Sequence, residues 1–482
     1  MRSLLHMVWV VTAAMLITTG CSRNPVTGKK QLTLMSEQQE IALGKEADPQ
    51  IIAQYGLYED KVLQDFINEK GKAMAAISHR PKLEYNFRIV DSDIINAFAV
   101  PGGYVYFTRG IMAHFNDEAQ FAGVLGHEIG HITARHSVIQ QRNAMLGNIG
   151  LIAGVVIKPE LARFAETASQ GMQLLFLKFG RDDEKQSDEL GVEYSSKIGY
   201  DATHMADFFT TLERQSARAG GGNLPEFLST HPNPDGRHDN VLKLAQDWKA
   251  KNPTASLAVN RNAYLKRIDG IVYGPDPRQG FLENSVFYHP EMKFQWSVPT
   301  GWSYQNAPTM VQLAEKNGKA LLQLSIAKAA NPREAAQMLV TNNQLQVLDA
   351  RETTVNGLQA YMMVADVPAS QQSPALRIQT YYIQKDQLIY QLLGVSTTTE
   401  FSAYVSSFTQ SMTSFRNLTD QEKINRKPER VRIKIVSQDL TLEQQLRQYN
   451  QPASRFEELA ILNGMQLKDK VSKGTMIKTV GN

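Results

Sequence analysis

The sequence predicts an α+β protein in three parts: a mainly helical domain with a small sheet, an α+β module, and a small C-terminal module. Three observations support this fold class. Apolar residues recur at helical spacing over 116–132, runs that alternate as strands do lie before and after that stretch, and 482 residues suffice for roughly two to four domains. The net charge of +3 and the 21% of charged residues are typical of an ordinary soluble protein, and no basic tract indicates a nucleic-acid partner.

Residues 1–20 are a predicted signal peptide, because the apolar run over 8–17 is short for a membrane span and stands at the very start. Cys21 follows directly and is the only cysteine in the chain, so it has no partner for an internal disulfide. Its position after Gly20 resembles a bacterial lipobox, with Thr18 where leucine is usual. The resemblance implies that Cys21 is lipidated and anchors the mature protein at the periplasmic face of the outer membrane.

Residues 83–91 and 97–107 alternate enough to predict strands, and a Pro-Gly-Gly sequence breaks the second one. The second strand ends shortly before the helix predicted over 116–132. If its edge is exposed beside that helix, Asn96, Ala97 and Phe98 can hold an extended peptide by backbone pairing. An ordinary core hairpin is the alternative, and the residues support it equally.

The helix over 116–132 carries the most informative motif, His127-Glu128-Ile129-Gly130-His131. Asn116 is expected to cap this helix. His127 and His131 are one turn apart and project from one face, where two imidazoles can bind one zinc ion. Glu128 lies about 100° around the helix from His127, so it flanks the metal and can take a proton from a water that the metal activates.

Two plainer readings of the motif are a surface pair of histidines and an ordinary helical ion pair. The burial expected of this helix argues against both, because two histidines and a glutamate in a buried helix need partners, which a metal supplies. The apolar positions are Phe121, Val124, Leu125, Ile129 and Ile132.

A catalytic zinc needs a third protein ligand and one open position. His136 is five residues after His131 and is expected to face elsewhere, so the ligand must come from another helix. Glu184 and Asp188 are again one turn apart: Glu184 would bind zinc, and Asp188 would accept a hydrogen bond from a ligand histidine. Gly191 would let the two helices approach closely. Because other acids lie alongside, a solvated acidic face is an equal alternative.

Together these motifs resemble the gluzincin metallopeptidases of the CAAX-prenyl-endopeptidase class, whose bacterial lipoprotein members act in outer-membrane quality control. The resemblance covers roughly residues 21–250, and three further stretches carry it, over 24–28, 96–110 and 231–237. Gln186 stands where relatives often carry an acid.

The resemblance implies that Glu184 is the third ligand, that Asp188 supports the site, and that His231 lies over the metal. His231 would either occupy the fourth zinc position or assist the transition state. Without the resemblance it would be a loop histidine before a Pro-Asn-Pro turn. Two glycine-rich stretches are expected near the site: a flexible loop over 217–223, and residues 144–157 as a packed helix, a lid, or alternatively a surface that touches membrane.

The remaining chain is predicted to be accessory. The protease domain is placed at 21–258, followed by a connector over 259–284, an α+β module over 285–416 with a linker over 417–430, and a last module over 431–482. The α+β module resembles PsbP-like binding modules and has no catalytic cluster. The last module resembles LysM modules, which bind glycans such as peptidoglycan, but Ser437-Gln438-Asp439 stands in place of the usual Gly-Asp-Thr.

The sequence therefore predicts a lipid-anchored zinc endopeptidase with one Zn²⁺ per chain on His127, His131 and Glu184, with Glu128 as proton acceptor and His231 beside the oxyanion. By the resemblance, its substrates are misfolded or stalled envelope proteins, and its candidate partners are the outer-membrane assembly machinery and peptidoglycan. The rival hypotheses are a chaperone or assembly factor with a gated or secondary protease site, and a cell-wall-binding lipoprotein.

Overall fold

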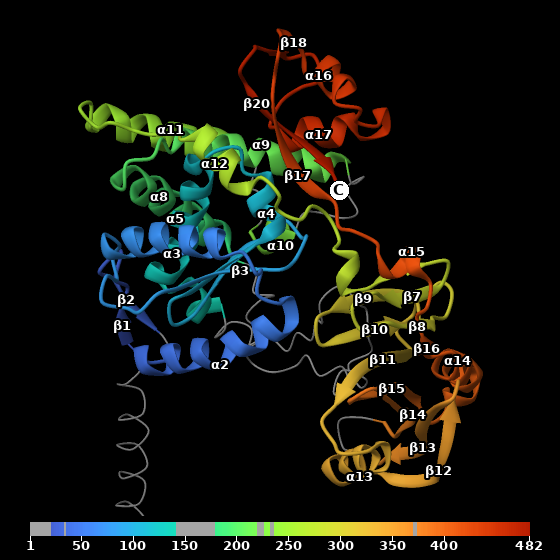
Figure 1. Ribbon diagram of the computed structural model, residues 1–482. Coiled ribbons are helices and arrows are strands. Elements are labelled where there is room, and N and C mark those ends of the chain that lie inside the picture. The colour runs from blue at the N-terminus through green and yellow to red at the C-terminus, as the bar shows by residue number, and fades with distance from the viewer. Residues whose placement is uncertain (1–20, 33–34, 141–178, 219–225, 232–235, 370–373) are drawn as a thin grey trace, which may run out of the picture.

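The computed structural model describes residues 21–32, 35–140, 179–218, 226–231, 236–369 and 374–482. The expectations for residues 1–20, 144–157, 220–222 and 232–234 lie outside these ranges. Figure 1 shows three bodies: a mainly helical one at the left, a sheet-rich one at the lower right, and the C-terminal module above the helical one. The α+β class is confirmed.

The helical body contains a sheet of three strands in the order β3-β5-β4, which are Asn86–Val90 (β3), Ala97–Val100 (β4) and Tyr104–Thr108 (β5). β3 runs parallel to β5, and β4 runs antiparallel to it. The predicted strands and the break between β4 and β5 are confirmed. Among the described strands β4 pairs only with β5, so it is an edge of the sheet.

The other elements of this body are two short paired strands and nine helices among the described residues. They are β1 (Cys21–Arg23), β2 (Lys30–Leu32), α2 (Glu37–Tyr55), α3 (Lys61–Ala76), α4 (Arg109–His114), α5 (Glu118–Ala134), α8 (Arg181–Lys197), α9 (Thr203–Arg218), α10 (Glu226–Thr230), α11 (Arg237–Lys251) and α12 (Arg261–Ile268).

Helix α5 carries the HExxH motif, and every one of its residues is buried. Its N-cap is Asp117, whose side chain accepts a hydrogen bond from the Gln120 backbone at 2.8 Å. The expectation that Asn116 caps the helix was wrong, because the Asn116 side chain turns back to donate to the His114 carbonyl. The helix ends where Arg135 adopts left-handed backbone angles, with φ at 61°.

Helix α8 crosses α5 at a contact between glycines. A Cβ atom on Gly126 of α5 would lie 2.9 Å from the Gly191 carbonyl oxygen of α8, and a Cβ on Gly191 would lie 3.1 Å from the Gly123 carbonyl oxygen. The close approach expected of Gly191 is therefore present. It brings the N-terminal half of α8 against the end of α5 that carries the histidines.

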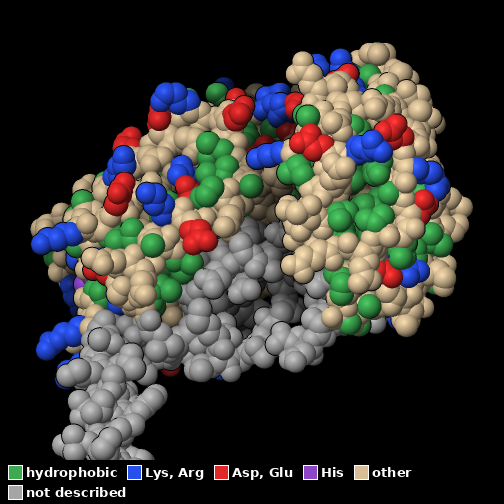
Figure 2. All heavy atoms as spheres, turned by 90° about the horizontal axis from the view of Figure 1, so that it is seen from below, with side chains coloured by type: hydrophobic (Ala, Val, Ile, Leu, Met, Phe, Trp, Pro, Cys, Tyr) green, Lys and Arg blue, Asp and Glu red, His purple; other side chains and the backbone are tan. Residues whose placement is uncertain are grey.

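The sheet-rich body has an antiparallel sheet of seven strands in the order β12-β13-β14-β15-β11-β10-β9. One buried cluster packs α14 against one face of this sheet, and a second packs α13 against the other. On the side seen in Figure 2, acidic and basic side chains lie intermingled over both large bodies. The elements are η3 (Pro277–Gln279), β6 (Phe281–Glu283), β7 (Val286–His289), β8 (Phe294–Ser297), β9 (Ser303–Ala307), β10 (Met310–Ala314), β11 (Ala320–Ala327), α13 (Pro332–Asn343), β12 (Gln346–Val355), β13 (Leu358–Val367), β14 (Leu376–Lys385), β15 (Leu388–Thr397), α14 (Phe401–Thr413), β16 (Arg416–Asn417) and α15 (Gln421–Ile424).

The C-terminal module pairs its first strand with its last and places two short helices between them. Its elements are β17 (Arg430–Ile435), β18 (Leu440–Thr441), α16 (Leu442–Gln448), η4 (Ala453–Arg455), α17 (Phe456–Leu462), β19 (Lys470–Val471) and β20 (Met476–Gly481). The module packs on the helical body. Val431 and Met476 belong to the same buried cluster as the apolar residues of α5 and α12.

Candidate metal centre

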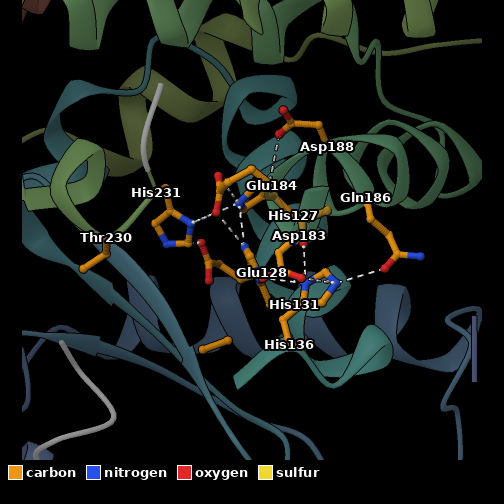
Figure 3. Close-up of polar contacts among 12 residues, drawn as sticks. His127, Glu128, His131, His136, Asp183, Glu184, Gln186, Asp188, Thr230 and His231 are labelled. Atoms are coloured by element: carbon orange, nitrogen blue, oxygen red, sulfur yellow. Dashed lines mark hydrogen bonds and ion pairs between the residues drawn. The ribbon is translucent and has the colours of Figure 1, made fainter. Parts of the chain in front are cut away.

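Four side chains converge at the centre of the helical body (Figure 3). His127 and His131 come from α5, Glu184 comes from the first turn of α8, and His231 follows α10. One nitrogen or oxygen atom from each lies within 4.8 Å of the others, and all four residues are buried. The structure therefore brings together the four residues that the sequence analysis associated with a metal.

The spacing of these atoms fits the ligand shell of a small cation. His127 Nε2 lies 3.0 Å from His131 Nε2 and 3.2 Å from His231 Nδ1. The Glu184 carboxylate lies 3.0 Å from His231 Nδ1, 3.5 Å from His131 Nε2 and 3.6 Å from His127 Nε2. A tetrahedral zinc with bonds of about 2.1 Å holds its ligand atoms about 3.4 Å apart.

Buried polar atoms without hydrogen-bond partners also fit a cation-binding site. Within the described part of the chain, both carboxylate oxygens of Glu128, Glu184 Oε2 and His231 Nε2 are buried and accept or donate no hydrogen bond. Buried groups in this state are costly unless a metal or water completes them. The donor set of two imidazoles and a carboxylate, with a third imidazole opposite, is one that zinc prefers.

Glu128 lies beside the centre rather than in it. Its Oε1 is 3.6 Å from His231 Nε2, and Figure 3 shows its carboxylate pointing into the space that His231 and His131 also face. Burial raises the pKa of Glu128 above its ordinary value, although the neighbouring imidazoles oppose this. A carboxylate with a raised pKa is suited to accept a proton and return it.

Asp188 supports His127. Its Oδ1 lies 2.9 Å from His127 Nδ1, so Nδ1–H donates to the carboxylate and Nε2 faces the centre. Arg237 holds the same carboxylate with two hydrogen bonds of 2.8 and 2.7 Å. Burial alone would raise the pKa of Asp188, but the positive charge of Arg237 and the bond from His127 hold it below its ordinary value.

Arg237 was not assigned a role from the sequence, although it ends the 231–237 stretch. Its Nη1 also lies 3.0 Å from Glu184 Oε2, off the direction of a hydrogen bond, and its guanidinium stacks 4.3 Å from the ring of Phe209. Two buried carboxylates need a buried cation. That requirement is the signal that could have identified Arg237.

His136 was expected to face elsewhere, and it is not among the four residues that converge on the centre, although it contacts the far side of His131. Its Nδ1 lies 3.0 Å from His131 Nδ1, and its Nε2 lies 2.9 Å from Gln186 Oε1. The expectation assumed that the helix continues. Because Arg135 leaves the helical conformation, the chain turns back and places His136 behind His131.

The three candidate peptide-binding residues lie at the start of the edge strand. Asn96, Ala97 and Phe98 are buried, with 3%, 0% and 6% of their surface exposed. The Phe227 amide of α10 donates to the Ile95 carbonyl at 3.2 Å, which ties the segment carrying His231 to the residue just before Asn96.

The stretch that follows Cys21 contacts the end of the metal helix. Cys21 begins β1. The Asn24 side chain donates to the carbonyl of Ala134, the last residue of α5, at 3.1 Å, and accepts from the amides of Val26 and Thr27. Among the described residues, no helix combines the length and apolar character needed to cross a membrane.

Residues 62–245 match the family model described as peptidase family M48. The chain is 30% identical over 325 residues to the beta-barrel assembly-enhancing protease of Yersinia pestis, covering 66% of this chain and 62% of that protein. It is 28% identical over 221 residues to the protein of the same name in Escherichia coli K12, covering 44% and 45%. The mitochondrial metalloendopeptidase OMA1 of Arabidopsis thaliana is 32% identical over 182 residues, covering 36% and 35%.

The chain spans less than two thirds of each of these relatives. A solved structure of cyanobacterial PsbP from Synechocystis is similar over 27% of the chain and 91% of its own, at 11% identity and a TM-score of 0.24. That score is too low to support the PsbP-like resemblance, which stays a prediction.

Proposed function

We propose that this chain, whose residues 62–245 form a metallopeptidase domain of family M48, is a zinc-dependent endopeptidase acting on proteins of the cell envelope. The observation that carries the proposal is the buried cluster of His127, His131, Glu184 and His231, with the partnerless carboxylate of Glu128 beside it. Catalytic zinc sites combine such ligands with an adjacent carboxylate.

His127, His131 and Glu184 would hold the zinc ion, and a bound zinc lowers the pKa of water and polarises a carbonyl group. Glu128 accepts the proton of the attacking water and then donates it to the amine that leaves. Asp188 and Arg237 keep His127 oriented with Nε2 toward the centre. The substrate backbone would pair with edge strand β4, beside the stretch of Asn96, Ala97 and Phe98.

The position of His231 supports a site to which the access of water is controlled. Its Nδ1 lies 3.2 Å from His127 Nε2 and 3.0 Å from Glu184 Oε1, which is the spacing of a fourth ligand rather than of an open position. With His231 in this position, its imidazole would fill the space that an attacking water needs. The enzyme would be inactive until His231 moves, after which its imidazole is available to stabilise the oxyanion.

The substrate class and the location are further parts of the proposal. Relatives named beta-barrel assembly-enhancing protease, together with the signal peptide and lipobox resemblance at Cys21, support a lipid-anchored envelope enzyme that degrades misfolded or stalled proteins. An assembly factor with a secondary protease site is the second candidate, which the same names and the closed His231 position favour.

The test combines the Glu128→Gln variant with zinc analysis. Glu128→Gln keeps the shape of the side chain but removes the base, so it is expected to retain one zinc per chain and to cleave an unfolded outer-membrane protein at least about a hundredfold more slowly. Normal cleavage by the variant would contradict the mechanism. If wild type and variant restore envelope assembly equally well in cells, the assembly-factor hypothesis is correct instead.

Lipidation is tested separately. Cys21→Ala is expected to be exported but to move from the membrane fraction to the soluble fraction. Retention of this variant at the membrane to the same extent would contradict the anchor.

A further inference from the structure

In both histidines of the HExxH motif, Nδ1 faces away from the centre. The two residues differ in the group that Nδ1 contacts. His127 Nδ1 faces the Asp188 carboxylate. His131 Nδ1 instead faces a second imidazole, His136 Nδ1, at 3.0 Å. Two imidazole nitrogens at this distance form a hydrogen bond only if one carries a proton and the other a lone pair. The tautomer of His131 therefore depends on that of His136.

The surroundings of His136 favour a proton on Nε2. Gln186 Oε1 lies 2.9 Å from His136 Nε2, and Asp183 Oδ1 lies 3.7 Å from the same nitrogen. Both oxygens are acceptors. Because a neutral imidazole has one N–H, a proton on Nε2 leaves a lone pair on Nδ1. The Ser187 hydroxyl, 3.3 Å from His136 Nδ1, can donate to that lone pair as well.

The amide of Gln186 could in principle be turned, so that its NH₂ group donates to His136. The proton would then sit on His136 Nδ1, and the proton of His131 on Nε2, where it faces the ligand cluster. Asp183 opposes this arrangement, because its carboxylate oxygen lies beside His136 Nε2 and is an acceptor that favours a proton there. Asp183 is itself held by the Gln140 side chain at 2.7 Å and the Gly180 amide at 3.1 Å.

We propose that Gln186 and His136 form a hydrogen-bond relay that sets the tautomer of His131, so that its Nδ1–H donates to His136 and its Nε2 lone pair is directed at the zinc. Both are positioning residues, since neither touches the substrate or the metal. The relay rests on the proposed zinc site. It does for His131 what Asp188 does for His127, with a neutral amide and imidazole in place of a carboxylate (Figure 3).

The direct test is the protonation pattern of the histidine rings in the zinc-loaded full chain labelled with ¹⁵N-histidine. The chain has ten histidines, and the His136→Gln variant identifies the signals of His136. We expect His136 to carry its proton on Nε2 and His131 to carry its proton on Nδ1. A wild-type His136 with its proton on Nδ1, or on both nitrogens, would overturn the relay.

Zinc affinity gives the second readout, measured by competition with a chromophoric chelator. Gln186→Met removes the acceptor at nearly constant volume, so His136 can move its proton to Nδ1 and stop accepting from His131. We expect zinc binding to weaken toward the roughly 10- to 100-fold that the loss of a ligand histidine's partner causes. Gln186→Glu keeps an oxygen acceptor and is expected to stay within about threefold of wild type at pH 8. Lys185→Met, on the exposed side of the same helix, is the matched control and is expected to change nothing.

The possible outcomes distinguish a failure of the proposed relay from a failure of the proposed zinc site. If wild type binds no zinc, the proposed function fails. If wild type binds zinc and Gln186→Met binds it equally well, the relay fails while the zinc site stands. If Gln186→Met and Gln186→Glu lose affinity equally, position 186 acts through packing and the relay fails as well.

Discussion

One buried guanidinium serves two buried carboxylates at the candidate centre. Glu184 and Asp188 are buried carboxylates, and Arg237 is a fully buried guanidinium that contacts both. A buried charge without a partner is far more costly than a buried pair. Arg237 therefore holds the site together before a metal is present, and a metal adds a second positive charge next to Glu184.

The first prediction at this scale concerns Arg237→Met. Without the guanidinium, two buried carboxylates lose their cation, so the metal-free protein is expected to lose about 3–5 kcal/mol of unfolding free energy. Zinc should restore part of this loss, because its charge compensates Glu184. Urea unfolding with EDTA and with excess zinc measures both effects.

Arg237→Lys is the control for this prediction. It keeps the charge but not the two-pronged contact with Asp188, so its stability should lie between those of wild type and Arg237→Met. Equal stability of Arg237→Met and wild type in EDTA would contradict the role given to Arg237.

At the scale of elements, the centre exists because α5 and α8 touch at glycines. Glu184 and Asp188 can reach His127 only if the two helix backbones approach this closely. The second prediction follows from the 2.9 Å between a Cβ on Gly126 and the Gly191 carbonyl oxygen. Gly126→Ala is expected to push the helices apart, to lower the melting temperature by several degrees, and to weaken zinc binding at least about tenfold.

Gly481→Ala serves as the control for Gly126→Ala, because a Cβ there meets no atom within 4 Å and the backbone is not left-handed. Both variants are compared by thermal unfolding and chelator competition. Wild-type zinc affinity in Gly126→Ala would show that the glycine contact does not position the ligands.

The start of α5 gives the third prediction, a pH dependence away from the metal. His204 Nδ1 of α9 lies 2.8 Å from Asp117 Oδ2, while Asp117 Oδ1 caps α5. The hydrogen bond with Asp117 holds the pKa of His204 above its ordinary value of 6.5, against the opposing effect of burial. Because the folded-state pKa is raised, the interaction of His204 with Asp117 adds to the free energy of unfolding. This stabilisation is fully present below pH 6.5 and is lost as the pH rises through the folded-state pKa.

His204→Gln tests this pH dependence. Its deficit in unfolding free energy relative to wild type is expected to be largest at pH 5.5, at no more than about 1 kcal/mol, and to shrink by pH 8.5. Urea unfolding of the metal-free proteins at the two pH values provides the comparison. If the deficit in unfolding free energy of His204→Gln instead grows toward alkaline pH, the stabilising role given to protonated His204 is contradicted.

At the scale of the whole molecule, the C-terminal module is joined to the loop that leads into the metal helix. Lys478 of β20 is fully buried and donates to three carbonyls, those of Ala113 at 2.8 Å, Phe115 at 2.7 Å and Leu462 at 3.0 Å. Ala113 lies in the last turn of α4, and Phe115 follows that helix on the way to α5. The last strand of the chain therefore holds the segment from which the HExxH helix starts.

The fourth prediction is that Lys478→Met destabilises the protease body as well as the C-terminal module. The replacement fills most of the space but leaves three buried carbonyls without a donor, which should cost at least about 2 kcal/mol. It should also increase hydrogen exchange at the start of α5. Lys473→Met is the control, because Lys473 is exposed and its backbone amide, not its side chain, makes the contact with Asp439.

Hydrogen exchange is the measurement that decides this fourth prediction. Faster exchange confined to the C-terminal module, with α5 protected as in wild type, would mean that the two bodies are not coupled through Lys478.

The sequence by itself determined the α+β class, the two strands before the HExxH helix, and the residues of the two helices that meet at the centre. Helix periodicity is local, so one-turn spacing was enough to place His127 with His131 and Glu184 with Asp188. Alternation likewise indicated strands over 319–327, 359–367 and 375–385 in the sheet-rich body, where the structure has β11, β13 and β14, because the two-residue period of a strand is also local.

Only the tertiary structure decided which residues support that centre. His136 reaches His131 because Arg135 turns the chain out of the helix, and Arg237 reaches Asp188 from a segment 49 positions away. Lys478 lies 365 positions from Ala113, with the whole sheet-rich body between them in the chain. Contacts of this kind depend on where the chain reverses and on which buried charge needs compensation, and no periodicity in the sequence encodes either.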